Sequence, residues 1–186
     1  MSPEWLTAIG TVGTFVVIAA SAAAALFQLR HMRGSNQIVA LTEVRETIES
    51  ANFQAAELFV SQLAERFEDP QVREGLLAPY FPPEFQPVRH MGNFFETFGV
   101  FVKNGIIDSY LACDLWAGVV ARNWEALRPV VASRRARTQN PALWENFEYL
   151  AAISTKFMDA HQSGTLPKNA PRMPLPEPWP EAQPRA

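Results

Sequence analysis

The residues that could do chemistry in this 186-residue chain are few and scattered. The three histidines are His31, His90 and His161, and the single cysteine is Cys113. No histidine has an acidic residue three positions before it, and no two are four residues apart. The helical ligand pairs of di-iron and zinc sites are therefore missing, and one cysteine cannot form a cysteine-rich zinc site. We predict neither a bound metal nor a cofactor.

Nucleophiles and acid/base pairs give an equally weak signal. Cys113 has no histidine near it in sequence, so a small core residue is the expected role. Glu43, Glu46 and Glu49 recur at helical spacing, which is typical of a solvated helix face. Neither a glycine-rich phosphate loop outside the apolar N-terminal run nor a Gly-x-Ser-x-Gly elbow occurs. The sequence predicts a protein that is not an enzyme and has no evident small-molecule substrate.

Composition narrows the class of protein further. Hydrophobic residues make up 48% of the chain and charged residues only 19%, so wholesale disorder is excluded. A single cysteine excludes a disulfide scaffold. The net charge of −3 and the isoelectric point near 5.6 argue against a nucleic-acid partner.

A charge-free segment stands at the front of the chain. From Trp5 to Leu29, 25 residues contain no Asp, Glu, Lys, Arg or His. About 20 apolar residues suffice for a helix to cross a bilayer, with Trp5 suited to one interface and Arg30 and Arg33 to the other. A cleaved signal peptide is a poorer match, because the apolar run is too long and its N-terminal flank is not basic. A buried helix of a soluble protein is the other alternative.

Charge on the two sides of this segment predicts its orientation. Every Lys and Arg of the chain lies after the segment, and Glu4 is the only charged side chain before it. The positive-inside rule then predicts a single-pass protein of the inner (cytoplasmic) membrane, with a short N-terminus outside and a cytoplasmic C-terminal domain.

Small residues recur along the same segment. Gly10 pairs with Thr14, and Ser21 with Ala25, as small-xxx-small motifs. Such pairs let helices approach closely in lipid, so we expect packing against transmembrane helices of other subunits. The alternative is that a lone helix surrounded by membrane lipids simply tolerates them.

The rest of the chain predicts an all-α fold. A helix is expected to about Glu68, either after a bend at Gly34–Asn36 or continuous with the segment before it. Residues 79–87 are expected to be a proline-rich loop that packs through Tyr80, Phe81 and Phe85. An aromatic stripe over residues 91–102 predicts the next helix, which should end at Lys103–Gly105.

Two more helices complete a predicted bundle of about four. Asp108 is expected to cap one that Pro129 kinks or breaks, and Asn140–Pro141 to begin the last. The expected domains are therefore a transmembrane anchor (1–33), a helical bundle (34–164) and a proline-rich extended tail (165–186).

Two regions are candidate contact surfaces: a basic cluster and the proline-rich tail. Arg134, Arg135 and Arg137 form a basic cluster, which is either a solvated helix end or a contact for anionic lipid or an acidic partner. In the tail, seven of the 22 residues after Gly164 are proline. The tail is either disordered or an extended docking arm, with three apolar anchors: Met173, Leu175 and Trp179.

Four motifs carry a resemblance to a known family. These are GVFVKNGIIDSYLACDLW, NWEALRPVV, RRAR and NPALWENFEYLA. Together they resemble a bacterial family of membrane-anchored helical proteins classed as a domain of unknown function, over roughly Trp5 to Phe157. The resemblance implies an N-terminal span and a helical body, brings no activity with it, and leaves the tail outside.

The expected function follows from this architecture. We expect a structural accessory or scaffolding subunit of a larger membrane protein complex, contacted through span, bundle and tail. An energy-transducing complex, respiratory or photosynthetic, is one candidate host. The alternative is a membrane-tethered regulatory or sensing module that binds a soluble cytoplasmic partner.

Overall fold

The computed structural model describes residues 3–176, and the side chains of all of these except residues 4–9, 29–36 and 64. Within that range the chain contains helices and no strand, so the predicted all-α class is confirmed. The elements are α1 (Pro3–Glu49), α2 (Ala51–Leu63), the 3-10 helix η1 (Ala64–Arg66), α3 (Pro70–Leu77), the 3-10 helix η2 (Pro83–Phe85), α4 (Gln86–Lys103), α5 (Ser109–Thr138) and α6 (Glu145–Ala160).

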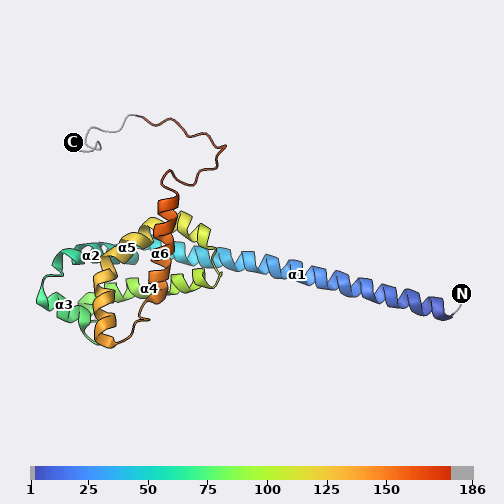
Figure 1. The fold of residues 1–186 in the computed structure, drawn as a ribbon, viewed down its shortest axis with the longest axis horizontal. Coiled ribbons are helices and arrows are strands. Elements are labelled where there is room, and N and C mark those ends of the chain that lie inside the picture. Colours follow the sequence, from blue (N-terminus) through green and yellow to red (C-terminus); the bar gives the residue numbers. More distant parts are fainter. Residues whose placement is uncertain (1–2, 177–186) are drawn as a thin grey trace.

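Helix α1 is a single rod of 47 residues that projects far out of the bundle (Figure 1). At 1.5 Å per residue it is about 70 Å long. The bend considered at Gly34–Asn36 does not occur, and the continuous alternative is confirmed. Among the described side chains of α1, those buried in the core are Ala40 and Val44, in the last turns of the helix.

The break falls instead at Ser50, so the prediction of one helix reaching Glu68 is wrong. The Ser50 hydroxyl donates to the carbonyl of Thr47 (2.7 Å) and accepts from the amide of Phe53 (3.2 Å). A serine that bonds the backbone on both sides favours a new helix start over continuation. Helix α2 begins there, and after it Asp69 caps α3 through its Oδ1, 2.9 Å from the amide of Gln71.

The proline-rich segment packs on the bundle through two of its three aromatic residues. Phe81 and Phe85 are buried, whereas Tyr80 is 89% exposed, contrary to expectation. The expected loop also ends too late, because Pro87 lies in the first turn of α4. Proline is tolerated at that position, where the backbone amide would have no intrahelical acceptor.

Helix α4 supplies most of the aromatic core. Phe95 and Phe98 are essentially inaccessible to solvent, and the Phe95 ring stacks on Phe147 of α6 with centroids 4.6 Å apart. Trp124 of α5 meets the same Phe147 edge-on at 5.0 Å. Aromatic side chains of α4 and α5 therefore both pack against Phe147 of α6.

The predicted ends of α4 and α5 are partly confirmed. Helix α4 ends at Lys103 as expected, and Asp108 caps α5 by accepting from the amide of Leu111 (2.9 Å). Helix α5 continues through Pro129 to Thr138, and its ribbon changes direction along the way (Figure 1).

The last helix starts later than predicted. Asn140 does not cap α6; its Oδ1 accepts from the amide of Ala142 (3.1 Å) and forms a turn. Helix α6 begins at Glu145, directly after Trp144, which adopts a left-handed backbone conformation (φ 54°). Its inner face buries Phe147, Leu150 and Ser154.

Candidate interaction surfaces

The first half of α1 is an exposed apolar surface. Residues Gly10–Gln28 have a mean hydropathy of 1.9, and none of them is buried. These 19 residues are about 28 Å long, close to the roughly 30 Å of a bilayer core. Helix α1 is thus long and apolar enough to cross a membrane once.

The predicted small residues lie along one side of this segment. Gly10, Thr14, Ser21 and Ala25 fall within a narrow sector at 100° per residue, and all four are exposed. The Thr14 hydroxyl donates to the carbonyl of Gly10 (2.8 Å), so it needs no partner from another helix. Close packing against other helices stays a prediction.

The interfacial residues of the span are only partly described. The side chains of Trp5, Arg30 and Arg33 lie outside the described residues, although their backbone belongs to α1. Their role at the two membrane interfaces therefore stays a prediction.

Arg134 faces inward and not toward solvent. It is 8% exposed, and its Nη1 donates to the carbonyls of Leu76 (2.6 Å) and Ala78 (3.1 Å). The guanidinium lies 4.1 Å from the centre of the Phe81 ring, as a cation–π contact. Burial lowers the pKa of Arg134 from its ordinary value. This arginine bonds the end of α3 and the residue after it, so it holds them against helix α5.

Arg135 is also engaged internally. Its Nε donates to the carbonyl of Leu143 (2.9 Å) and its Nη1 pairs with Glu148 of α6 (2.7 Å). Only Arg137 of the cluster is exposed. The prediction of one basic contact surface is therefore wrong for Arg134 and Arg135, because tertiary packing turns them onto the protein. For Arg137, contact with lipid or a partner stays a prediction.

The junction of α4 with α6 holds a network of polar contacts that was not predicted from the sequence. The residue before α6, Trp144, gives the helix no side-chain cap. Glu96 of α4 does this instead: its Oε2 accepts from the amides of Asn146 and Phe147, both at 3.0 Å. Its Oε1 accepts from the side-chain amide of Asn146 at 2.7 Å. A carboxylate thus satisfies donors of the first turn of a helix from another element.

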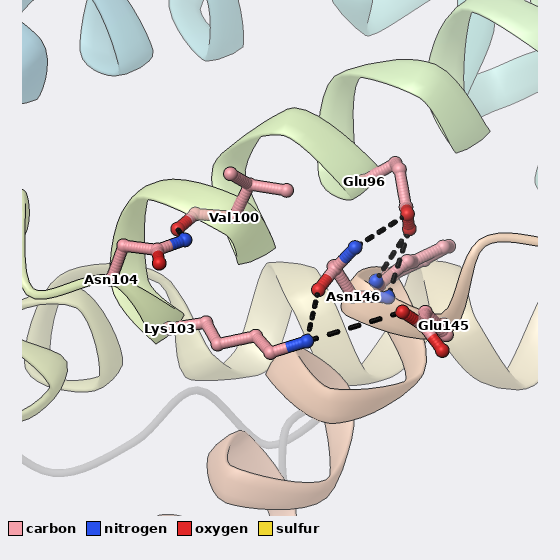
Figure 2. A network of polar contacts seen from close by, with 7 residues as sticks. Glu96, Val100, Lys103, Asn104, Glu145 and Asn146 are labelled. Atoms are coloured by element: carbon pink, nitrogen blue, oxygen red, sulfur yellow. Dashed lines mark hydrogen bonds and ion pairs between the residues drawn. The ribbon is translucent and has the colours of Figure 1, made fainter. Parts of the chain in front are cut away.

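Lys103 extends this network at the end of α4 (Figure 2). Its Nζ donates to the Asn146 side-chain oxygen (3.1 Å) and lies 4.0 Å from a carboxylate oxygen of Glu145. Figure 2 shows Glu96 and Lys103 reaching toward Asn146 from the same helix. The two side chains hold the start of α6 against α4.

Two glycines of α4 make the close approach of this junction feasible. A Cβ at Gly92 would lie 2.2 Å from the Trp144 ring, and one at Gly99 would lie 2.1 Å from the backbone oxygen of Asn146. Gly92, Glu96, Gly99 and Lys103 are spaced i, i+4, i+7 and i+11. This spacing places them on one face of α4, and it is the signal that sequence reasoning missed.

A cleft between α5 and α6 brings together two residues that are far apart in sequence. Cys113 of α5 and His161, just after α6, both line it, together with Phe157 of α6. Burial raises the pKa of the Cys113 thiol, while the neighbouring Ser154 hydroxyl acts in the opposite direction. The thiol is 4% exposed and stays protonated at neutral pH, which is typical of a structural cysteine. In the part of the chain that the structure describes, no three His, Cys, Asp or Glu side chains gather as a metal site.

The tail leaves the end of α6 and extends away from the bundle (Figure 1). Its first part is held by Thr165, which donates to Asp114 of α5. Further along, Met173 is 79% exposed and Leu175 is 88% exposed. Trp179, the third predicted anchor, lies outside the described residues. Docking of the tail on a partner stays a prediction.

These elements define a class of protein: an all-α bundle carried on one long N-terminal helix, the outer half of which is apolar and unburied. The chain belongs to the family DUF4760, described as a domain of unknown function, whose family model matches residues 15–154. The predicted resemblance to a family of unknown function is confirmed, over a range that leaves the tail outside. No curated protein and no solved structure matches the chain.

Proposed function

We propose that this protein is a membrane-anchored accessory subunit that scaffolds a larger membrane protein complex. The observation that carries the proposal is the continuity of α1, because one helix is at once the apolar segment and a packed part of the bundle core. From Gln28 to Ala40, a buried residue of α1, the helix rises about 18 Å. A helix without a break fixes both the height and the rotation of the bundle. A flexible tether, in contrast, would leave both the height and the rotation of the bundle free.

The proposed orientation comes from charge. Arg30 and Arg33 follow the apolar segment, while no basic residue precedes it. This asymmetry supports a cytoplasmic bundle and an external N-terminus in a bacterial inner membrane. Protease added to sealed spheroplasts should leave the bundle intact until the membrane is breached. Cleavage of the bundle in sealed cells would reverse the orientation.

The tail supports a third contact with the host. Met173 and Leu175 are too exposed to contribute to the bundle, and the prolines around them limit the conformational entropy lost on binding. The same observation favours a second candidate function, a membrane-tethered regulatory module whose tail recruits a soluble partner.

One experiment separates the two functions. Native membranes are dissolved in mild detergent, and the assembly that retains the chain is separated by size and identified. Stoichiometric co-migration with one membrane complex, energy-transducing or other, supports the scaffold. Association with a substoichiometric soluble protein supports the regulatory module, and migration as an isolated chain contradicts both.

A tail truncation tests the third contact separately. Deleting Pro167–Ala186 should weaken co-purification with the host and leave membrane fractionation unchanged, because α1 is intact. Full recovery of the complex at rising salt and detergent would show that the tail does not dock.

A further inference from the structure

A groove between the last turns of α1 and helix α4 combines aromatic rings with a carboxylate. Phe94, Phe98 and Phe101 of α4 line it together with Glu43 and Thr47 of α1. Phe98 is buried, whereas Phe94 and Phe101 are half-buried. The volume of the groove is about 200 Å³, below the roughly 300–1,000 Å³ of small-molecule pockets. It therefore has the size for one long side chain. We call it the α1–α4 groove.

The polar groups of the α1–α4 groove differ in whether they are bonded. The Thr47 hydroxyl donates to the carbonyl of Glu43 (2.9 Å), and the hydroxyl of Thr97, which also lines the groove, donates to the carbonyl of Asn93 (3.0 Å). The Glu43 carboxylate, in contrast, forms no hydrogen bond or ion pair with any side chain that the structure describes. The group of the groove that is left to bind a partner is thus a carboxylate.

The charge around the groove is negative. Glu46, one turn after Glu43, is exposed and has no ion pair among the described residues. Arg45, which lies between them in sequence, pairs with Glu49 instead (2.8 Å). No basic residue lines the groove. The described part of the chain therefore leaves this negative charge without a counter-charge.

Aromatic rings beside a carboxylate suit a side chain with an apolar stem and a cationic head. Lysine and arginine bury their methylene stems on apolar surface and keep the charged head near water. A cation within about 6 Å of an aromatic ring is also attracted by the ring. An apolar side chain would shield Glu43 from water without bonding it, and an acidic one would be repelled. Charge and shape together favour lysine or arginine.

The position of the groove along α1 indicates where such a side chain comes from. From Gln28, the end of the apolar segment, to Glu43 the helix rises about 22 Å. Lysine and arginine concentrate within about 15–20 residues of the cytoplasmic ends of transmembrane helices, and 15 helical residues span about 22 Å. A helix that crosses the membrane beside α1 can therefore carry basic residues at this height. A parallel second copy is a poorer match, because its Arg33 would lie about 15 Å nearer the membrane than Glu43.

We propose that the α1–α4 groove binds a lysine or arginine side chain from the cytoplasmic flank of a transmembrane helix of the host complex. Glu43 pairs with the cationic head, and the phenylalanine rings pack on the stem. The inference rests on the proposed scaffold function and its orientation. It goes beyond them by assigning a surface of the bundle and the chemistry of the host segment that the surface binds.

Photo-cross-linking in native membranes tests the proposal on the full-length chain. Benzoylphenylalanine replaces Thr97, which is exposed at the groove. In the control it replaces Leu58 of α2, which is exposed and does not line the groove. Each label is combined with Glu43→Gln, with Glu43→Lys, or with the matched control Glu74→Gln on α3, where the glutamate is also exposed. Mass spectrometry identifies the cross-linked peptides, and circular dichroism checks the helical content of each purified variant.

The cross-link from residue 97 should map to another membrane protein, within about 20 residues of the end of a transmembrane helix and in a segment that contains lysine or arginine. Glu43→Gln should lower its yield about two- to fivefold, the size expected for a partly exposed ion pair. Glu43→Lys should abolish it by repulsion, and Glu74→Gln should leave it unchanged.

Three results would overturn the proposal: a yield that does not depend on Glu43, a cross-link to any other segment, including a second copy of this chain, or a yield no higher than that from residue 58. Size separation of the same detergent extracts shows which proposal has failed. If the chain still co-migrates with one membrane complex, the scaffold function stands without the groove. If the chain migrates alone, both are wrong.

Discussion

The N-terminal half of α1 and the junction of α4 with α6 differ in how far the rest of the chain covers and bonds them. At the junction, Glu96 and Lys103 bond the first turn of α6, and Gly92 and Gly99 leave room for it. Along Gly10–Gln28 no residue is buried by the rest of the chain, and Phe15 and Phe27 are 72% and 77% exposed.

This difference separates what the chain provides for itself from what its surroundings must provide. The bundle has a hydrophobic core, and helix ends such as those of α5 and α6 are bonded from within the chain, so we expect it to fold without the anchor. A continuous exposed apolar helix, in contrast, exceeds what a soluble monomer normally leaves in water. In the proposed function, lipid or other transmembrane helices cover it.

Removal of the anchor should give the largest effect. Deleting residues 1–33 should move the chain from the membrane fraction to the soluble fraction, since about 0.8 kcal/mol per buried CH₂ group is lost over the whole segment. The bundle should stay folded, because Ala40 and Val44, the buried residues among the described side chains of α1, lie after the deleted segment. Fractionation followed by circular dichroism measures both outcomes. The tail deletion Pro167–Ala186 is the control and should remain in membranes; loss of helix in the anchor deletion would show that the two regions are not independent.

At the junction, Gly99→Ala should be the most damaging single substitution. The new Cβ would meet the backbone oxygen of Asn146, which cannot rotate away as a side chain could. We expect a loss of about 3 kcal/mol in the free energy of unfolding, measured by urea titration of the full chain in detergent. Gly118→Ala is the matched control on α5, where only the flexible end of Arg122 is near. It should be neutral or stabilise by about 0.5–1 kcal/mol.

Helix ends were predictable where their signals are local. Asp108 and the Lys103–Gly105 segment act through bonds to residues within five positions, and both ends fell as expected. The start of α6 depends on Glu96, about 50 residues earlier, and was misplaced at Asn140–Pro141. When the capping side chain comes from another helix, the residues next to the capped helix give no signal of its start.

The same reasoning explains the misreading of the arginines. Sequence shows that Arg134, Arg135 and Arg137 are close along the chain, but their directions depend on α3 and α6, which pack on α5 only in the folded protein. The bend considered at Gly34–Asn36 does not occur, for a different reason. One glycine costs a helix only about 1 kcal/mol, and neighbouring turns can offset that cost.

A smaller effect is expected from Glu96→Gln, which keeps the shape of the side chain and removes its charge. One carboxylate oxygen becomes a donor, so at least one of the three bonds to Asn146 and Phe147 is lost. The free energy of unfolding should fall by about 1.5–3 kcal/mol. Glu46→Gln, on the exposed face of α1, should leave it unchanged. Equal effects in both variants would mean that the bonds of the junction add no stability.

The smallest effect should come from Arg134→Lys, and it tests whether the bundle is as self-contained as the comparison requires. Lysine keeps the charge but cannot span the carbonyls of Leu76 and Ala78 while lying flat on Phe81. The expected loss is about 1–2 kcal/mol in the free energy of unfolding, from weakened charged hydrogen bonds and cation–π contact. Arg137→Lys, three residues further along α5 and exposed, should not change the free energy of unfolding. A second measurement is the binding of the chain lacking residues 1–33 to anionic vesicles. Here a substitution of Arg137 can change binding and one of Arg134 should not, because of the two only Arg137 is exposed. If Arg134→Lys weakened vesicle binding while leaving the free energy of unfolding intact, the internal role assigned to Arg134 would be wrong.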